Sequence, residues 1–196
     1  MDTEHQARDD SHLIETKVSS EAVFDGALLH VRRDEVRLPG GGVGRREYII
    51  HPGAVLMIPV LPDGRLIVER QFRYPVNRVF IEFPAGKLGP GEDALATARR
   101  ELMEETGYEA ATWTRLGRIH PVIGYSNEVI EFYIAEQLKH VGAQLDEGEF
   151  LELKEMTVDE MLAALDRGEI TDGKTVSSLL LYARRVALLA GGREQA

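Results

Sequence analysis

The chain has 196 residues, of which 43% are hydrophobic and 29% are charged, as in an ordinary globular protein with one sizeable core. Its formal net charge of −10 argues against general binding to nucleic acids or acidic membrane surfaces, because like charges repel. It has no cysteine, which excludes disulfides, thiolate zinc sites and cysteine nucleophiles. We find no signal-like or membrane-spanning apolar run and expect a cytoplasmic protein.

The start of the chain is predicted to form a flexible tail and a small β unit. Residues 1–12 are polar, which is typical of a mobile terminus. Residues 27–38 and 43–50 indicate two strands, and residues 39–42 between them read Pro-Gly-Gly-Gly. Glycine adopts positive φ without strain, so this segment suits a hairpin turn. We therefore expect residues 13–50 to form an antiparallel β unit.

The following elements are more apolar and indicate the core. Residues 54–61 and 65–73 flank a Pro-Asp-Gly turn and are expected to form a second, more buried hairpin. Residues 93–106 are predicted to be helical, because Leu and Ala recur at spacings of three and four before Gly107. Further strands are expected at residues 79–83, 112–119, 129–136 and 150–156, and helices at residues 157–166 and 174–189.

This order of elements indicates the fold class. Strands and helices are mixed without a regular alternation of strand and crossover helix. The pattern favours an α+β fold, or an α/β/α sandwich with a mixed sheet, over a doubly wound parallel sheet.

Three carboxylates crowd one face of the helix expected at residues 93–106. Glu101, Glu104 and Glu105 are three and four residues apart, so they share a face, and like charges at this spacing are mutually destabilising. Hard divalent cations such as Mg²⁺ bind such groups. The alternative is a solvated acidic face that Arg99 and Arg100 partly neutralise. Helix geometry alone leaves both interpretations open.

The spacing of the surrounding residues decides between these interpretations. Residues 86–108 follow the pattern G-x5-E-x7-R-E-U-x-E-E-x-G-U, where U is a bulky apolar residue. Seven fixed positions, each with a usage of roughly 0.1, recur by chance in about 10⁻⁵ of such chains. The segment closely resembles the Nudix box, although Tyr108 stands where an aliphatic residue is commoner. In that family a loop–helix–loop holds Mg²⁺ or Mn²⁺ against a diphosphate.

The resemblance implies a metal site and assigns its ligands. Glu101 and Glu105 match the main ligands, Glu104 matches a residue that joins them or bridges a second ion, and the carbonyl group of Ala85 completes the site. Gly86 matches the glycine that lets the backbone approach the metal and the phosphate.

Two further residues of the box have supporting roles by the same resemblance. Arg100 is expected to orient the glutamates, and Glu92 to brace the loop or add a ligand. Taken alone, Glu92 is equally well explained as an acid near a helix N-terminus, where the macrodipole favours negative charge.

Segments outside the box resemble one branch of the family, the ADP-ribose pyrophosphatases and related nucleotide-sugar hydrolases. The matching segments lie at residues 46–54, 69–75, 82–86 and 124–128. The resemblance implies Mg²⁺-dependent hydrolysis of ADP-ribose to AMP and ribose 5-phosphate by a homodimer. It also implies that the β unit at residues 13–50 packs against the partner subunit and that residues 51–196 form the hydrolase domain. The alternatives are another nucleotide sugar such as GDP-mannose, or a non-catalytic sensor of ADP-ribose.

The same branch supplies expectations for substrate contacts. Arg46, Arg73, Glu82, Gly86 and Glu128 fall on its substrate side. The two arginines match groups that grip the terminal ribose or the phosphates, which is plausible because charge-assisted hydrogen bonds to phosphate are strong.

Two loops match the family less closely. The acidic loop at residues 146–149 matches a mobile loop that brings a glutamate over the site, which makes Glu147 the expected general base and Glu149 an extra ligand, or the reverse. Ala27 stands where the branch often stacks an aromatic ring on adenine, and Phe24 is nearby.

One motif is a decoy. Residues 168–175 satisfy the P-loop pattern G-x4-G-K-[ST], which cradles phosphates when it follows a strand. Here a helix is predicted before it, and Glu169 and Asp172 would repel phosphate. We expect a turn between two helices, with Lys174 near the start of the second.

Overall fold

The computed structural model describes residues 9–143, 145, 148 and 150–193. The chain divides into two compact units. The first, here called the N-terminal unit, comprises Met1–His51 and Val122–Asn127. The second, here called the main unit, comprises Pro52–Pro121 and Glu128–Ala196.

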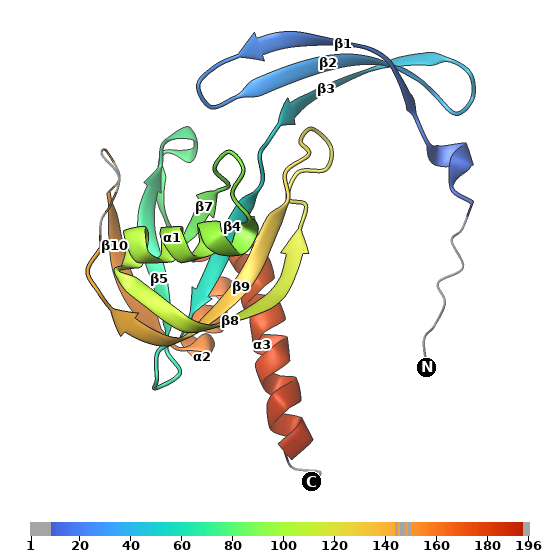
Figure 1. Cartoon of the computed structure of the whole chain (residues 1–196). Helices are drawn as coiled ribbons and strands as arrows, with labels where there is room; N and C mark the ends of the chain where they lie inside the picture. Colours follow the sequence, from blue (N-terminus) through green and yellow to red (C-terminus); the bar gives the residue numbers. More distant parts are fainter. Residues whose placement is uncertain (1–8, 144, 146–147, 149, 194–196) are drawn as a thin grey trace. The chain divides into compact units, whose positions relative to one another are not determined.

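The N-terminal unit is built on a three-stranded antiparallel sheet with the order β1-β2-β3 (blue to teal in Figure 1). The strands are Thr16–Asp25, His30–Arg37 and Val43–Ile50, and a short 3-10 helix, Ser11–Leu13, precedes them. The expected hairpin is confirmed: β2 pairs with β3, and Gly41 in the turn has a φ of 88°. Strand β1 was not predicted, because every one of its residues is exposed and the sequence carries no apolar alternation there.

This sheet buries very little. Within its three strands, Asp34 and Val36 of β2 are the buried residues. The phenol of Tyr48 donates a hydrogen bond of 3.0 Å to Oδ2 of Asp34 across the β2–β3 pair. A sheet with two largely exposed faces gains little from hydrophobic burial on its own.

The main unit contains two sheets. One has the order β7-β4-β9-β8, with strands Ala85–Lys87, Ala54–Pro59, Ile130–His140 and Tyr108–Ile119. Its central pair, β4 and β9, is parallel, and the outer pairs are antiparallel. The other sheet is antiparallel with the order β10-β5-β6, formed by Leu151–Met156, Leu66–Arg73 and Arg78–Glu82.

The second predicted hairpin is wrong. The two segments at residues 54–61 and 65–73 form β4 and β5, which belong to different sheets and share one isolated bridge between Val60 and Leu66. Strand β4 instead pairs with β7 and β9, whereas β5 pairs with β10 and with β6, which follows it directly. The partners β9 and β10 are distant in the sequence, which a local pattern cannot specify. Strand β7 was also not predicted, since three residues carry no periodicity.

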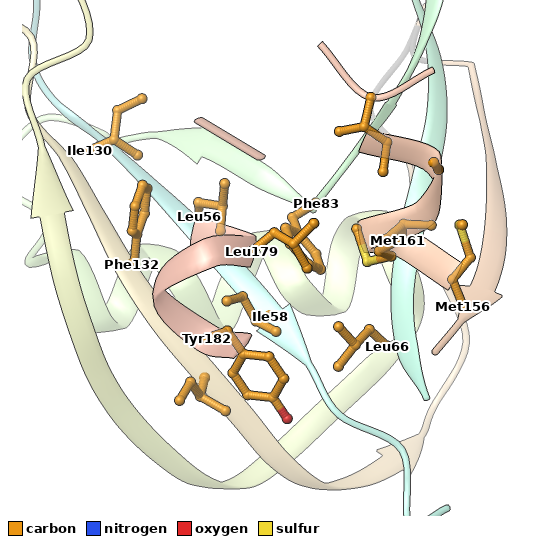
Figure 2. Packing of buried hydrophobic residues seen from close by; sticks show 14 of the residues in the cluster. Leu56, Ile58, Leu66, Phe83, Ile130, Phe132, Met156, Met161, Leu179 and Tyr182 are labelled. Atoms are coloured by element: carbon orange, nitrogen blue, oxygen red, sulfur yellow. The ribbon is translucent and has the colours of Figure 1, made fainter. Parts of the chain in front are cut away.

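Helices cover both faces of β4 and β9. Helix α1 (Ala94–Thr106) packs on Val55 and Met57, whereas α2 (Val158–Asp166) and α3 (Gly173–Arg193) pack with Leu56 and Ile58. Side chains of successive strand residues point to opposite faces of the sheet, so β4 contributes side chains to two separate cores. Figure 2 shows the larger one, to which Phe83, Phe132 and Leu179 belong. The predicted α+β class with a mixed sheet between helices is confirmed.

Local signals fix the ends of α1. Asp93 caps its start by accepting hydrogen bonds from the backbone N–H groups of Leu95 and Ala96. Gly107 ends it with a φ of 73°, and a Cβ there would lie 2.6 Å from the backbone nitrogen of Ala143. Both the conformation and the close contact require glycine.

The decoy motif links α2 to α3. Helix α2 precedes it, and residues 168–172 belong to the expected turn between helices, with Gly168 at a φ of 72°. Residues 173–175 begin α3, so Lys174 lies near the start of this helix as expected. Among the helices in the described residues, none is both long and apolar enough to cross a membrane.

Candidate active site

Two glutamates of α1 lie against the backbone of β7. Glu105 is 5% exposed, and the N–H of Ala85 donates a hydrogen bond of 3.1 Å to its Oε2 atom. A Cβ on Gly86 would lie 2.0 Å from Cδ and 2.1 Å from Oε1 of Glu101. Only a glycine permits this approach without displacing the carboxylate. The structure thus brings Glu101 and Glu105 to adjacent residues of one strand.

Arg100 links the remaining carboxylates of this helix face. Its Nη1 atom donates to Oε2 of Glu104 at 2.8 Å and lies 3.0 Å from Oε1 of Glu101. Its Nε and Nη2 atoms donate to the two oxygens of Glu92, each at 3.1 Å. One guanidinium is therefore shared between three carboxylates, and these hydrogen bonds raise the pKa of Arg100. We name Arg100, Glu92, Glu101, Glu104 and Glu105 the Arg100 cluster.

Glu92 braces the loop that precedes α1. Besides Arg100, its Oε2 atom accepts hydrogen bonds of 3.0 Å from the N–H of Gly89 and from the hydroxyl of Thr97. The hydrogen bond from Arg100, followed by those from Gly89 and Thr97, lowers the pKa of Glu92 to about 2. A carboxylate held this firmly fixes the loop to the helix.

A second charged group surrounds Glu82, at the end of β6. Nε and Nη2 of Arg73 donate to its two oxygens, each at 2.8 Å, and Lys174 of α3 forms an ion pair with Oε2. Lys174 also contacts Oδ2 of Asp172 at 3.0 Å. The Glu82 side chain is 2% exposed. We name these four residues the Glu82 cluster.

The charges of the Glu82 cluster shift one another's ionisation. Burial opposes ionisation of Glu82, but the hydrogen bonds from Arg73 and the charge of Lys174 hold its pKa below the usual range. The bond to Glu82 raises the pKa of Arg73. The sequence placed Lys174 near the start of a helix but gave it no role in the site, because its partner Glu82 is 92 positions away.

Comparison with known proteins identifies the family. A model described as "NUDIX domain" matches residues 50–179, and one described as "Nucleoside diphosphate sugar hydrolase N-terminal domain" matches residues 15–49. The chain belongs to the Nudix family. The residues that carried the sequence resemblance are those that α1 and β7 bring together.

Relatives extend this Nudix assignment over nearly the whole chain. The ADP-ribose pyrophosphatase of Bacillus subtilis (strain 168) is 36% identical over 180 residues, covering 91% of this chain and 97% of the relative. A methanol dehydrogenase activator of Bacillus methanolicus is 40% identical over 164 residues, covering 83% and 89%. A GDP-mannose pyrophosphatase of Citrobacter koseri (strain ATCC BAA-895 / CDC 4225-83 / SGSC4696) is 32% identical over 189 residues, covering 87% and 97%.

A solved structure agrees in fold. The crystal structure of an ADP compounds hydrolase aligns with a TM-score of 0.80 and 26% identity, covering 91% of this chain and 96% of that one. Together these likenesses make the chain a Nudix hydrolase, an enzyme of a family that uses divalent metal ions.

The Arg100 cluster has the chemistry that a divalent metal requires. Its carboxylate oxygens are ligands of the type that hard cations prefer. Because Gly86 has no side chain, the carboxylate of Glu101 lies directly against the backbone at this residue. Within the described residues, no three acidic or histidine side chains form a ready-made metal site. Arg100 pairs with Glu101 and Glu104 and partly balances their charge.

The other expected site residues are placed as follows. Arg46 lies on β3 in the N-terminal unit, where its Nε donates to Oε2 of Glu15 at 2.9 Å. Glu128 lies in the main unit, partly buried and two residues before β9. Glu147 and Glu149 lie outside the described residues.

Proposed function

We propose that this chain is a Mg²⁺-dependent ADP-ribose pyrophosphatase of the cytoplasm that hydrolyses ADP-ribose to AMP and ribose 5-phosphate. The observation that carries the proposal is the seating of Glu101 and Glu105 against Ala85 and Gly86. It places both carboxylates against the backbone of β7. The similarity to the Bacillus subtilis ADP-ribose pyrophosphatase over 91% of the chain supports this choice of substrate.

The metal ligands in this proposal are Glu101, Glu104, Glu105 and the carbonyl oxygen of Ala85. Mg²⁺ in this position supplies charge that neutralises a diphosphate and lowers the pKa of a bound water. Arg100 holds Glu101 and Glu104 close together beforehand, because both pair with its Nη1 atom. In the metal-free protein this guanidinium reduces the repulsion between the two carboxylates, a role that Mg²⁺ would share on binding.

The base in this proposal is Glu147, with Glu149 as an additional ligand once substrate is bound. Glu147→Gln and Glu149→Gln, measured separately by single-turnover kinetics, assign the two roles: the base variant slows the chemical step by about 10²-fold or more. If neither variant slows that step, the loop does not supply the base.

Arg73 is proposed to contact the substrate phosphates, with Glu82 as its support. Arg73 is 42% exposed and uses two of its five N–H donors for Glu82, so further donors remain for an anion. Both oxygens of Glu82 already accept hydrogen bonds, so its role is to orient Arg73. Gly86 and Glu128 are the further substrate contacts proposed within the main unit, and Arg46 is a proposed substrate contact on the N-terminal unit.

We propose further that residues 13–50 mediate a homodimer. These residues expose nine large apolar side chains: Leu13, Ile14, Val18, Val23, Phe24, Leu28, Leu29, Val43 and Ile50. Clustered apolar surface marks interaction sites. Sedimentation equilibrium is expected to give a dimer that Phe24→Asp weakens and the matched Phe72→Asp, an exposed aromatic residue of the main unit, does not. A monomeric wild type would contradict this.

Substrate identity is tested with a panel of compounds and coupled phosphate release. ADP-ribose, GDP-mannose, other nucleotide sugars and a dinucleoside polyphosphate are compared by kcat/KM with Mg²⁺ or Mn²⁺. We expect ADP-ribose to lead. The similarity to a GDP-mannose pyrophosphatase makes GDP-mannose the second candidate, and a higher kcat/KM for it would replace our proposal. Tight binding of ADP-ribose without turnover of any compound would indicate a sensor.

A further inference from the structure

A separate pocket lies between α1 and β8 in the main unit. It encloses about 320 Å³ and is lined by Arg99, Arg100, Met103, Glu109, Ala110 and Trp113. This volume falls within the range of small-molecule sites, which are lined largely by apolar groups with a few polar ones.

The pocket opens on the side of α1 away from β7. Arg99 and Met103 each precede a glutamate, Glu101 or Glu105, by two residues, which places them about 200° around the helix axis from it. The glutamates contact Ala85 and Gly86, so the two pocket residues face another direction. The pocket is therefore distinct from the candidate active site, and Arg100 is the residue that borders both.

Trp113 forms a fixed aromatic wall of this pocket. Its indole N–H donates a hydrogen bond of 3.1 Å to the carbonyl oxygen of Ala110. Its ring packs edge-on against Tyr133, with centroids 6.3 Å apart and an interplanar angle of 76°. Tyr133 is 9% exposed and belongs to the core under α1. The hydrogen bond and the ring contact together restrict rotation of the Trp113 side chain, and a fixed indole ring is suited to stacking with a planar ligand.

Arg99 provides a positive charge at the same pocket. It is exposed, and it forms no ion pair with any residue in the described part of the chain. Arg100, by contrast, is already bound to Glu92, Glu101 and Glu104. A guanidinium beside an aromatic ring matches a ligand that joins a planar ring to a phosphate, because Arg binds phosphate through two parallel hydrogen bonds.

We propose that this pocket binds a nucleoside monophosphate, with the base against Trp113 and the phosphate at Arg99. Glu109, on the pocket lining, offers an acceptor for an amino group of the base. The proposal does not depend on the substrate of the active site, because binding here is measured without metal and without turnover.

The single tryptophan of the chain makes the test direct, since all tryptophan fluorescence of the protein comes from this pocket. The full-length protein in EDTA is titrated with AMP, adenosine or inorganic phosphate, and calorimetry gives the stoichiometry. We expect a saturable fluorescence change with AMP, and binding about tenfold weaker for adenosine and for phosphate, each of which lacks one half of the interaction. Absence of saturable AMP binding by both methods, or phosphate binding as tight as AMP binding, would overturn the proposal.

Three variants locate the site. Arg99→Glu is expected to weaken AMP binding at least tenfold, whereas Arg184→Glu, the same charge change at an exposed position of α3, leaves it unchanged. Arg73→Ala, which alters the candidate active site, also leaves it unchanged. If Arg99→Glu and Arg184→Glu weaken AMP binding equally, or if Arg73→Ala alone weakens it, AMP binds elsewhere. Turnover of ADP-ribose in Mg²⁺, assayed separately on the wild type, tests the proposed hydrolase function independently.

Discussion

The Arg100 cluster and the Glu82 cluster are both dense groups of charge in the main unit, but their arrangements are opposite. In the first, one guanidinium is shared between Glu92, Glu101 and Glu104. In the second, one buried carboxylate is shared between Arg73 and Lys174. An arrangement in which several anions share one cation gains from a further cation, whereas a buried anion with two cations is already neutralised. The balance of charge, more than the number of ion pairs, separates a ligand site from a structural support.

The largest effect is expected on turnover when Glu105 of the Arg100 cluster is changed. Glu105→Gln removes a charge that we assign to metal binding, so kcat falls by at least ~10³, or about 4 kcal/mol of transition-state stabilisation. Steady-state kinetics measure the loss, and circular dichroism checks that the fold is intact. Asp166→Asn, at an exposed end of α2, is the control and retains full turnover. Wild-type turnover in Glu105→Gln would remove the metal site from the mechanism.

The second prediction concerns stability at Glu82. Glu82→Ala leaves Arg73 and Lys174 without the carboxylate that they share, and breaking a buried pair in this way costs about 3 kcal/mol. Urea denaturation measures the free energy of unfolding. Glu104→Ala, in the partly exposed Arg100 cluster, is the matched comparison and costs less than about 1 kcal/mol in EDTA. Equal losses in the two variants would erase the distinction between the clusters.

The third prediction links Arg100 to the metal. Arg100→Gln removes the cation shared by three carboxylates, so the metal-free variant is destabilised by about 1 kcal/mol. Mg²⁺ then stabilises the variant more than it stabilises the wild type, because the ion relieves a larger repulsion. Thermal unfolding in EDTA and in Mg²⁺ gives the two shifts. If Mg²⁺ raises the unfolding temperatures of the wild type and the variant equally, the charge of Arg100 does not substitute for that of a metal ion.

The smallest effect is a pH dependence at Glu92. Its pKa is lowered from 4.5 to about 2 in the folded protein, first by Arg100. A lowered carboxyl pKa stabilises the fold fully above the unfolded value, and this contribution disappears as the pH falls from 4.5 to about 2. Unfolding free energies between pH 6 and pH 2 should therefore fall less steeply in Glu92→Gln than in the wild type. Parallel pH profiles would show that Glu92 is not held as the structure indicates.

Local signals allowed much of the Nudix segment to be predicted. The expected helix at residues 93–106 differs by one residue from α1, because Asp93 and Gly107 act on neighbouring backbone groups. The spacing of Glu101, Glu104 and Glu105 is likewise a property of one helix. Their roles as ligands remain predictions, as do those of Glu147 and Glu149.

Contacts between distant segments could not be predicted in this way. The sequence placed β4 and β5 in one hairpin, but β4 pairs in parallel with β9, more than seventy residues later. The pair of Lys174 with Glu82 spans 92 positions and leaves no periodic trace. Such pairings depend on how whole sheets and helices pack, which no short window of sequence contains.

The close approach at Gly86 offers a way to separate folding from function. A methyl group at this position would meet the carboxylate of Glu101 at 2.0 Å, and that group is the mobile end of a side chain rather than backbone. Gly86→Ala would therefore push one oxygen donor aside while every charge in the protein stays in place. On the proposed assignment of Glu101, the result would be a folded form with lower turnover and an unchanged net charge, so a loss of activity could be traced to the position of one carboxylate.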